Sequence, residues 1–468
     1  MAEQTQAEET FDAIILGAGQ SGDPLARAWA KAGKRVALIE RDGVGGTCVN
    51  RGCTPTKTMI ASARVAYLAR RGADYGVGTG PVTVDIRKVR QRKRDIVVSF
   101  RQGDEKKLAE TDGVELIHGE GRFTGPKTVE VAPNGGGAGR TLTAAQVFIN
   151  TGARPAVPKI EGLESVASLD STSVMELGEV PGHLVILGGS YIALEFGQMF
   201  RRFGSRVTVV EKSEHLLGHE DPDVAEAMAK IMEEDGLELL LGAQAVSVAK
   251  TPEGVSLTVK AGDGERTISG SHLLVAVGRT PNTEALNLAA AGVETDDAGH
   301  VKANERLETS APGVWALGDV KGGPQFTHIS YDDFRILRAN LLEGGHRTTA
   351  DRPVPYTVFT DPQLGRVGMT EADAKKAGRN IKAAKLPMSE VARALETDET
   401  RGFMKAVVDA DTQQILGAAI LGVDGGEVMA VLEVAMMGHL PYTALRDATL
   451  AHPTLAESLN NLFLTLDE

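Results

Sequence analysis

The residues of this chain best suited to redox chemistry are Cys48 and Cys53, its two cysteines, with four residues between them. A disulfide between them would close a small loop, and because the stability gained from loop closure grows with loop length, a purely structural role contributes little. A zinc site would need four ligands, and no second cysteine pair supplies them. The spacing also differs from the C-x-x-C of thioredoxin-like proteins. We therefore interpret the pair as a redox couple, which needs a source of electrons.

A source of electrons is indicated by residues 11–40, which predict a strand, a glycine-rich turn, a helix and a second strand. Gly17 permits the tight turn, Gly19 lets a pyrophosphate approach the backbone, and Gly22 lets the helix pack closely against the strand. Glu40 ends the second strand, where a carboxylate accepts hydrogen bonds from a ribose. The segment therefore predicts a dinucleotide-binding site.

The same arrangement returns later in the chain. Its first glycine is Gly188 and its closing acid is Glu211, and the offset from the first copy is equal for both, since 188 − 17 = 171 and 211 − 40 = 171. Gly188 and Gly189 open the turn, while Ala193 replaces the last glycine, which the fingerprint allows. Ser190 replaces the middle glycine and is a departure from the pattern. Two such units predict two bound dinucleotides.

Glu211 also bears on the choice of nicotinamide cofactor. A carboxylate at this position favours a free ribose 2′-hydroxyl and repels a 2′-phosphate. The sequence therefore predicts a preference for NADH over NADPH, although the nearby cations Lys212 and Arg206 can reorganise the pocket.

Charge and composition exclude several classes of partner. The formal net charge is −13 and the isoelectric point about 5.4, which argues against nucleic acid or an anionic membrane surface as the main partner. Residues 1–10 are polar and acidic, so we expect a disordered tail rather than a signal peptide. No apolar run approaches the length of a membrane span. We expect a cytoplasmic protein with no membrane partner, where reducing conditions suit a catalytic cysteine pair.

The cysteine segment, residues 45–57, resembles the active-site signature of the flavin-containing pyridine nucleotide-disulfide oxidoreductases. This family includes dihydrolipoamide dehydrogenase, glutathione reductase and mercuric reductase. Residues 150–155 resemble its hinge motif, residues 277–282 its return into the flavin domain, and residues 314–319 its second flavin fingerprint. Besides the first glycine turn and Glu40, the resemblance assigns to FAD the residues Gly46, Thr47, Lys57, Thr151, Gly152, Gly278, Arg279, Gly318 and Asp319.

The resemblance implies an α/β fold with two Rossmann-type dinucleotide-binding domains, for FAD and NAD(P), and a C-terminal α+β dimerisation domain. The expected boundaries are 1–10 for the tail, 11–155 for the first part of the FAD domain, 156–275 for the NAD(P) domain, 276–345 for the second part of the FAD domain, and 346–468 for the dimerisation domain.

The resemblance also implies an electron path. NADH passes a hydride to FAD, and the flavin reduces the disulfide between Cys48 and Cys53. By the family pattern, Cys53 faces the flavin as a thiolate and Cys48 attacks the substrate. Lys57 and Glu195 resemble the ion pair beside the reactive edge of the flavin, although from sequence Glu195 can equally be an acid on a helix surface.

A proton donor and acceptor is indicated near the end of the chain. His452, Pro453 and Glu457 resemble the family's acid/base dyad, which is delivered into the partner subunit's active site, so a homodimer is implied. We expect Pro453 to open a helix, with His452 just outside it and Glu457 about one turn in. Glu457 would then orient the imidazole and stabilise the imidazolium.

The electron acceptor is indicated by the branch of the family. Residues 54–58, 150–152 and 323–327 resemble the mercuric reductase branch, and within it the bacterial reductases linked to oxidant stress and copper(II) reduction. Soft thiolates suit mercury or copper(I). However, residues 460–468 lack the cysteine pair that receives the ion in mercuric reductase. We expect a small-molecule or metal-ion substrate, namely Hg(II), Cu(II) or an oxidant, and no resident metal; the alternatives are dihydrolipoamide or another disulfide, and a redox sensor that binds NADH.

Overall fold

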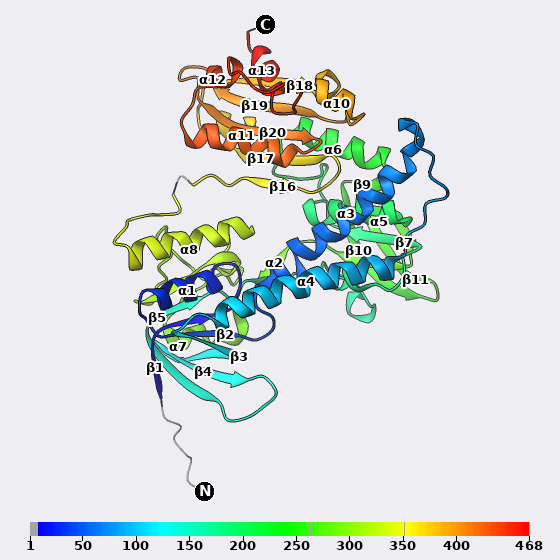
Figure 1. Cartoon of the computed structure of the whole chain (residues 1–468). Helices are drawn as coiled ribbons and strands as arrows, with labels where there is room; N and C mark the ends of the chain where they lie inside the picture. Colours follow the sequence, from blue (N-terminus) through cyan, green and yellow to red (C-terminus); the bar gives the residue numbers. More distant parts are fainter. Residues whose placement is uncertain (1–7, 263, 351, 468) are drawn as a thin grey trace. The chain divides into compact units, whose positions relative to one another are not determined.

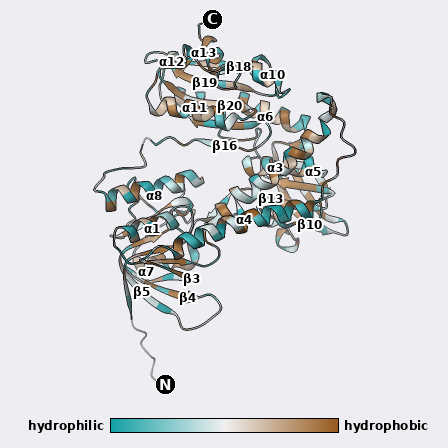
Figure 2. Cartoon of the chain, viewed as in Figure 1, coloured by the Kyte–Doolittle hydropathy of each residue, from teal (hydrophilic) through white to brown (hydrophobic). Residues whose placement is uncertain are grey.

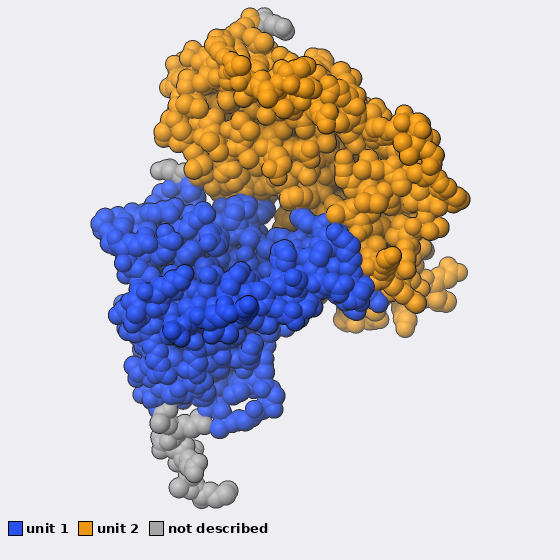
Figure 3. Space-filling model, in the orientation of Figure 1, with its two compact units in different colours: residues 1–58, 90–156, 278–352 blue, residues 59–89, 157–277, 353–468 orange. Residues whose placement is uncertain are grey.

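Strands and helices alternate along the chain, as the sequence predicted, and they divide between two units (Figure 3). The structure is a computed structural model that describes residues 8–262, 264–350 and 352–467. Unit 1 comprises residues 1–58, 90–156 and 278–352, and unit 2 comprises residues 59–89, 157–277 and 353–468. The division falls inside two long helices, α3 (Cys53–Arg70) and α4 (Ile86–Ala109).

Within the residues described, unit 1 is built on a six-stranded sheet of order β1-β2-β3-β4-β5-β15, in which β1 also pairs with β5 (Figure 1). Its strands are β1 (Glu9–Leu16), β2 (Val36–Glu40), β3 (Val114–Gly125), β4 (Thr128–Pro133), β5 (Arg140–Ile149) and β15 (Val314–Ala316). β1 is parallel to β2 and β5, and β15 is parallel to β5. Because parallel strands point the same way, the residues that follow β1, β5 and β15 meet at one edge.

The helices of unit 1 begin mostly where the parallel strands end. They include α1 (Gly22–Lys31), α2 (Gly46–Arg51), α7 (Leu288–Ala291) and α8 (Thr327–Leu342). A separate two-stranded sheet pairs β6 (Ala153–Pro155) with β14 (Arg279–Pro281) in antiparallel orientation. The chain therefore leaves unit 1 and returns to it through adjacent strands, at the two segments that the sequence marked as exit and return.

The first half of unit 2 repeats the strand–turn–helix pattern of unit 1. Its parallel sheet has the order β13-β7-β8-β9, and its antiparallel sheet the order β10-β11-β12. The bounds are β7 (His183–Leu187), α5 (Tyr191–Phe203), β8 (Arg206–Val210), α6 (Pro222–Glu234), β9 (Glu238–Leu240), β10 (Ala243–Thr251), β11 (Gly254–Ala261), β12 (Gly264–Gly270) and β13 (His272–Val275). The second dinucleotide-binding fold predicted from the sequence is therefore present.

The C-terminal half of unit 2 is an α+β arrangement on a five-stranded antiparallel sheet of order β16-β17-β20-β19-β18. Its strands are β16 (Tyr356–Val358), β17 (Gln363–Gly368), β18 (Ile381–Pro387), β19 (Phe403–Asp409) and β20 (Ile415–Gly422). Its helices are α9 (Glu371–Lys376), α10 (Ala392–Glu396), α11 (Gly425–Met437), α12 (Tyr442–Arg446) and α13 (Ser458–Leu464). The fold class expected from the sequence is confirmed.

Hydrophobic residues follow the strands of each sheet (Figure 2). In β1 the run from Ala13 to Leu16 is at most 2% exposed, as expected for a parallel strand that is covered on both faces. Among the residues described, none of the helices combines the length and the apolar character needed to cross a bilayer.

Two local expectations were wrong at their boundaries. The tail expected over residues 1–10 does not extend to Glu9 and Thr10, because these residues belong to β1 and pair with β5; residues 1–7 lie outside the described part. The helix expected to open at Pro453 begins instead at Ser458. Residues 454–457 form a turn in which the Glu457 N–H donates to Thr454 Oγ1 at 3.2 Å, so a side chain rather than a helical turn takes up this donor.

A buried lysine ties α6 to the five-stranded sheet within unit 2. Lys405 on β19 is 3% exposed, and its Nζ lies 2.7 Å from Glu371 Oε1, 2.9 Å from Asp223 Oδ1 and 3.1 Å from Asp221 Oδ2. The three carboxylates raise the pKa of Lys405 against the effect of its own burial. Each partner thus offsets the cost of burying the others.

We predict that Lys405→Met lowers the free energy of unfolding by about 3–5 kcal/mol, because it leaves the buried carboxylate of Asp221 without its cation. Urea unfolding measures the loss. The matched control is Lys385→Met, since Lys385 Nζ lies 2.7 Å from Asp223 Oδ2 but its side chain is 45% exposed. An exposed pair contributes less than about 1 kcal/mol, so equal losses in the two variants would contradict this account of the cluster.

Candidate active site

The cysteine pair lies where α2 ends and α3 begins in unit 1. Cys48 is in α2, and Cys53 is the first residue of α3. The loop before α2 is fixed by Asn50, whose Nδ2 donates to Gly43 O at 3.1 Å, to Val44 O at 2.9 Å and to Gly46 O at 2.9 Å. The side chain of Asn50 therefore fixes the loop that leads into α2, the helix that contains Cys48.

The two sulfurs lie in different surroundings. Both are free thiols; Cys48 is partly buried and Cys53 is exposed. A hydrogen bond with Cys53 and burial raise the pKa of Cys48, while Thr327 and Lys57 act in the opposite direction. Cys53 Sγ also lies 3.3 Å from Thr327 Oγ1 at the start of α8. The neighbouring sulfur and burial therefore disfavour the thiolate form of Cys48.

The first glycine turn has the geometry expected of a dinucleotide site. Gly17 has φ +108°, and a Cβ on Gly22 would lie 2.0 Å from Gly17 O, so neither position accommodates a side chain. Glu40 closes the turn: its Oε2 accepts from Ala18 N and its Oε1 from Asp42 N, both at 2.8 Å. Burial raises the pKa of Glu40. At Gly19 an added Cβ would meet only Asn150 Nδ2, at 3.5 Å, which leaves the backbone approachable from that side.

The second glycine turn repeats these contacts at the offset found in the sequence. Glu211 Oε2 accepts from Gly189 N at 2.6 Å, and Glu211 Oε1 accepts from Ser213 N at 2.8 Å. These donors correspond to Ala18 and Asp42, since 18 + 171 = 189 and 42 + 171 = 213. The internal repeat therefore extends from sequence spacing to individual hydrogen bonds.

The two turns differ at the start of the helix that follows each of them. α5 begins at Tyr191, two positions earlier in its repeat than α1, which begins at Gly22, since 191 − 171 = 20. Ser190 is the N-cap residue of α5 and makes no capping bond with its side chain. Ala193 is fully buried, so its methyl group fits where Gly22 permits none. The replacement of two glycines by Ser190 and Ala193 in the second fingerprint thus occurs together with the earlier start of α5.

The exit and return segments of unit 1 are joined by side chains. Thr151 Oγ1 donates to Asn282 O and Asn282 Nδ2 donates to Thr151 O, both at 2.8 Å. Arg279 donates to Ala153 O, and its Nε lies 3.8 Å from Asp319 Oδ2. Burial raises the pKa of Asp319.

The glycines of the exit, return and second-fingerprint segments adopt left-handed backbone conformations. Gly152, Gly278 and Gly318 have φ +67°, +125° and +65°. Around Gly152 and Gly278 no atom among the described residues lies within 4 Å of an added Cβ, so both border open space in unit 1. Gly46 has φ +61°, and a Cβ there would lie 2.9 Å from Gly19 Cα, which brings the loop before the cysteines against the first turn.

A buried polar network at the sheet edge was not predicted from the sequence. Asn150 Nδ2 donates to Gly17 O at 2.9 Å, and Ser21 Oγ bonds both Asn150 Oδ1 at 2.6 Å and Ser330 Oγ at 2.9 Å. Asp333 is fully buried, and its Oδ2 accepts from Gly318 N at 2.8 Å. Ser21 and Asn150 lie in segments that the sequence analysis assigned to the first glycine turn and to the hinge motif, whereas Ser330 and Asp333 lie in α8, which it did not use. Asn150, a polar residue directly after an apolar strand, was the signal available there.

The predicted acid/base dyad is formed within unit 2. His452 Nδ1 lies 2.9 Å from Glu457 Oε2 and 3.1 Å from Glu457 Oε1. The dyad therefore forms in a turn, without the helix that was expected to position it. Delivery of His452 to a partner subunit stays a prediction.

Glu195 on α5 is 3% exposed, and its Oε1 accepts from Phe359 N at 2.9 Å, so it is not a surface acid. Lys57 belongs to unit 1 and Glu195 to unit 2. Their pairing stays a prediction.

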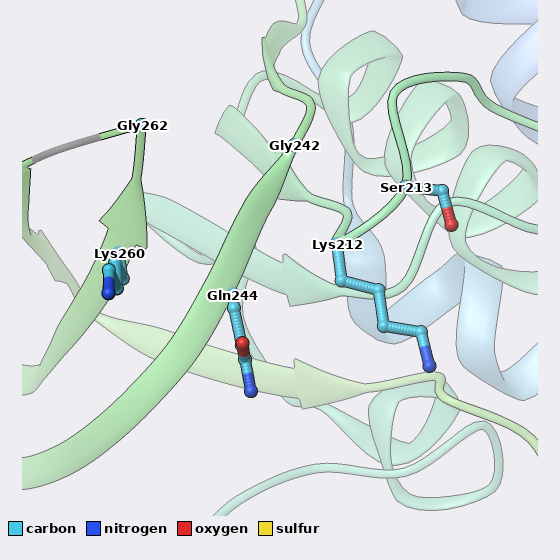
Figure 4. A pocket seen from close by; sticks show the side chains of 6 residues that line it. All are labelled: Lys212, Ser213, Gly242, Gln244, Lys260 and Gly262. Carbon is cyan, nitrogen blue, oxygen red and sulfur yellow. The ribbon is translucent and has the colours of Figure 1, made fainter.

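A pocket of about 560 Å³ lies next to Glu211 in unit 2 (Figure 4). It is lined by Lys212 and Ser213 after β8, Gly242 and Gln244 near the start of β10, and Lys260 and Gly262 at the end of β11. Two cations, Lys212 and Lys260, therefore line this pocket. Among the described residues, no three His, Cys, Asp or Glu side chains are grouped so that they could hold a metal ion.

Comparison with known proteins agrees with this geometry. The family "Pyridine nucleotide-disulphide oxidoreductase" matches residues 11–333, and its dimerisation domain matches residues 354–463. The chain is 39% identical over 458 residues to the probable pyridine nucleotide-disulfide oxidoreductase RclA of Escherichia coli (strain K12), covering 97% of this chain and 98% of that protein. It is 38% identical over 458 residues to a mercuric reductase of Staphylococcus aureus, covering 98% of this chain and 83% of that protein.

A solved structure is similar over the same length. The "Cu(II) complex of HOCl-induced flavoprotein disulfide reductase RclA from Escherichia coli" matches with a TM-score of 0.88 at 38% identity, covering 97% of this chain and 99% of that chain.

We predict that Gly22→Ala lowers the flavin content of the purified protein at least about tenfold, because its Cβ meets Gly17 O and opens the turn that approaches the pyrophosphate. The ratio of flavin to protein absorbance measures the effect. The matched control is Ala193→Gly at the equivalent position of the second turn, where flavin content stays unchanged and stability falls by about 1 kcal/mol. Full flavin content in Gly22→Ala would refute the assignment of the first turn.

Proposed function

The chain belongs to the pyridine nucleotide-disulphide oxidoreductase family, in its mercuric reductase-like branch, and on this premise we propose that it reduces a metal ion or an oxidant. The family uses FAD and a nicotinamide cofactor, and the dimerisation domain supports a homodimer. In this proposal residues 11–155 and 276–345 bind FAD, residues 156–275 bind the nicotinamide cofactor, and residues 346–468 form the dimer in the cytoplasm. The observation that supports it best is the hydrogen-bonded cysteine pair between two helix starts.

The residues of unit 1 fit FAD. The turn from Gly17 to Gly22 leaves the backbone approachable for a pyrophosphate, Glu40 is placed for a ribose, and Asp319 lies at the second fingerprint beside Arg279. When bound, FAD supplies the conversion of a hydride into a pair of electrons that a disulfide can accept. The protein's part is to hold Cys48 and Cys53 at the end of that path and to control their protons.

The reduced cysteine pair then passes its electrons to the electron acceptor. Two electrons leave the pair as the disulfide between Cys48 and Cys53 forms again, and they reduce either two Cu(II) ions to Cu(I) or one Hg(II) ion to Hg(0). In this proposal Cys48, whose pKa is raised by its hydrogen bond with Cys53 and by burial, binds the metal ion once a base removes its proton, and the His452–Glu457 dyad of the partner subunit is that base. The similarity to RclA, whose solved structure is a Cu(II) complex, favours copper.

Proton balance separates the proposal from its alternative. Oxidising NADH with Cu(II) or Hg(II) releases a proton, whereas reducing a disulfide such as lipoamide with NADH takes one up. We therefore expect NADH oxidation with Cu(II) under anaerobic conditions to acidify a weakly buffered solution, with a Cu(I) chelator reporting two Cu(I) ions per NADH. Turnover with lipoamide alone would establish the disulfide reductase instead, and no turnover with any acceptor would favour the redox sensor.

We predict that Cys53→Ser abolishes both the long-wavelength absorbance that follows anaerobic reduction with NADH and the turnover of the acceptor. Cys48→Ser removes turnover but retains the long-wavelength band, because a thiolate at Cys53 remains to interact with the flavin. Absorbance titration with NADH measures both variants. Simple bleaching of the flavin in wild type and in Cys53→Ser alike would show that the cysteines lie outside the electron path.

We also propose that NADH is the preferred electron donor, because Glu211 stands where a 2′-phosphate would enter. In this proposal Lys212 and Lys260, which line the adjacent pocket, allow residual use of NADPH (Figure 4). The variant Lys212→Ala/Lys260→Ala is predicted to lower kcat/KM for NADPH about tenfold while changing kcat/KM for NADH less than about twofold. Equal losses for both cofactors would show that the two lysines act on the fold or on a shared part of the cofactor.

A further inference from the structure

A buried carboxylate on α8, that of Asp333, connects the second fingerprint, residues 314–319, to the last residue of unit 1. Asp333 is fully buried, and its Oδ2 accepts from Gly318 N at 2.8 Å. Its Oδ1 accepts from Arg352 Nη1 at 2.7 Å, although the two residues are 19 positions apart. Arg352 ends unit 1. A single carboxylate therefore joins the guanidinium of Arg352 to the backbone of the fingerprint.

The carboxylate of Asp333 needs cations because it lies out of contact with water. A buried carboxylate is costly unless it is paired and hydrogen-bonded. Lys321 Nζ lies 3.3 Å from Oδ2, the oxygen that also accepts from Gly318, whereas Arg352 bonds the other oxygen. Arg352 thus fixes the orientation of the carboxylate, and with it the direction from which Oδ2 meets the Gly318 N–H.

Gly318 depends on such outside contacts for its conformation. It has φ +65°, and a glycine reaches many other conformations at little cost. On its other side an added Cβ would lie 2.8 Å from Ser330 Oγ, a group that bonds Ser21 Oγ at 2.9 Å. Ser330 and Asp333 lie three positions apart on one face of α8 and hold Gly318 together. Because Asp319 follows directly, a rotation of the backbone at Gly318 would displace its carboxylate.

We propose that Arg352 is a positioning residue for FAD, because through Asp333 it keeps Asp319 in the place where the second fingerprint binds the cofactor. The inference rests on the proposed function, in which Gly318 and Asp319 belong to the FAD site. It adds a residue outside every motif that the sequence analysis used.

A neighbouring ion pair provides a matched control. Arg347 Nη2 lies 3.0 Å from Asp332 Oδ1, and the Arg347 side chain is 50% exposed, against 13% for Arg352. Arg352 also lies 3.4 Å from Asp332 Oδ2. Arg347 therefore ties the same stretch of chain to α8, but through a carboxylate other than the one that bonds Gly318.

The test measures how fast FAD leaves the full-length holoprotein. After dilution, the rise in fluorescence of the released FAD gives its dissociation rate constant. We expect Arg352→Met to raise this rate at least about tenfold, since a hydrogen bond to a charged group is lost. We expect a rise of less than about threefold in Arg352→Lys, which keeps the charge, and of less than about twofold in Arg347→Met.

A double-mutant cycle shows whether Arg352 acts through Asp333. In the background of Asp333→Asn the buried charge is absent, so we expect Arg352→Met to change the dissociation rate less than about twofold there. A tenfold effect in that background would overturn the inference, because Arg352 would then act by another contact. This comparison also covers the case in which Arg352→Met alone fails to fold, since the double variant has no unpaired buried carboxylate.

The remaining outcomes separate the inference from the proposed function. An unchanged rate in Arg352→Met overturns the inference, and so does an equal increase in Arg347→Met, which would show that any link between this stretch and α8 has the same effect. The expected pattern of rates in a protein that reduces no metal ion or oxidant would refute the proposed acceptor and leave the role of Arg352 standing.

Discussion

The two glycine turns depend on one repeated interaction, a carboxylate that bridges two backbone N–H groups. Glu40 joins the glycine turn after β1 to the segment after β2, and Glu211 joins the equivalent segments after β7 and β8. Without such an acceptor, the N–H groups at the end of each pair of strands would compete for other partners. The carboxylate thus fixes the conformation of each turn through contacts within the protein itself.

Much of this could be predicted from the sequence because the signals are local. The second strand–turn–helix–strand pattern was predicted from its glycines and its closing acid, and β7 ends before Gly188 and β8 before Glu211. The equal offset of the two fingerprints is repeated in matching contacts. The pairing of His452 with Glu457 followed from a short motif. Where the local signal was weaker, the prediction failed, because Pro453 is compatible with a helix start but a side-chain hydrogen bond holds the turn instead.

The rest could not be predicted because it joins distant parts of the chain. Asn150, directly after β5, donates a hydrogen bond to Gly17 O, and Asp333, within α8, accepts one from Gly318 N. Lys405 forms ion pairs with carboxylates at the starts of two helices, α6 and α9. Each of these residues is an ordinary polar side chain in its own segment. The roles of Asn150 and Asp333 follow only from the sheet order, which places the ends of β1, β5 and β15 together, and the role of Lys405 follows from the packing around the five-stranded sheet.

The contact between Cys53 and Thr327 also bears on how the protein is made. Unit 1 is assembled from three separate stretches of chain, and the last of them contains Thr327. During synthesis from the N-terminus, Cys53 leaves the ribosome long before Thr327, and the sheet cannot take up β15 until residues 314–316 have followed. The contact between Cys53 and Thr327 therefore forms only after residues 59–89 and 157–277 of unit 2 have been synthesised.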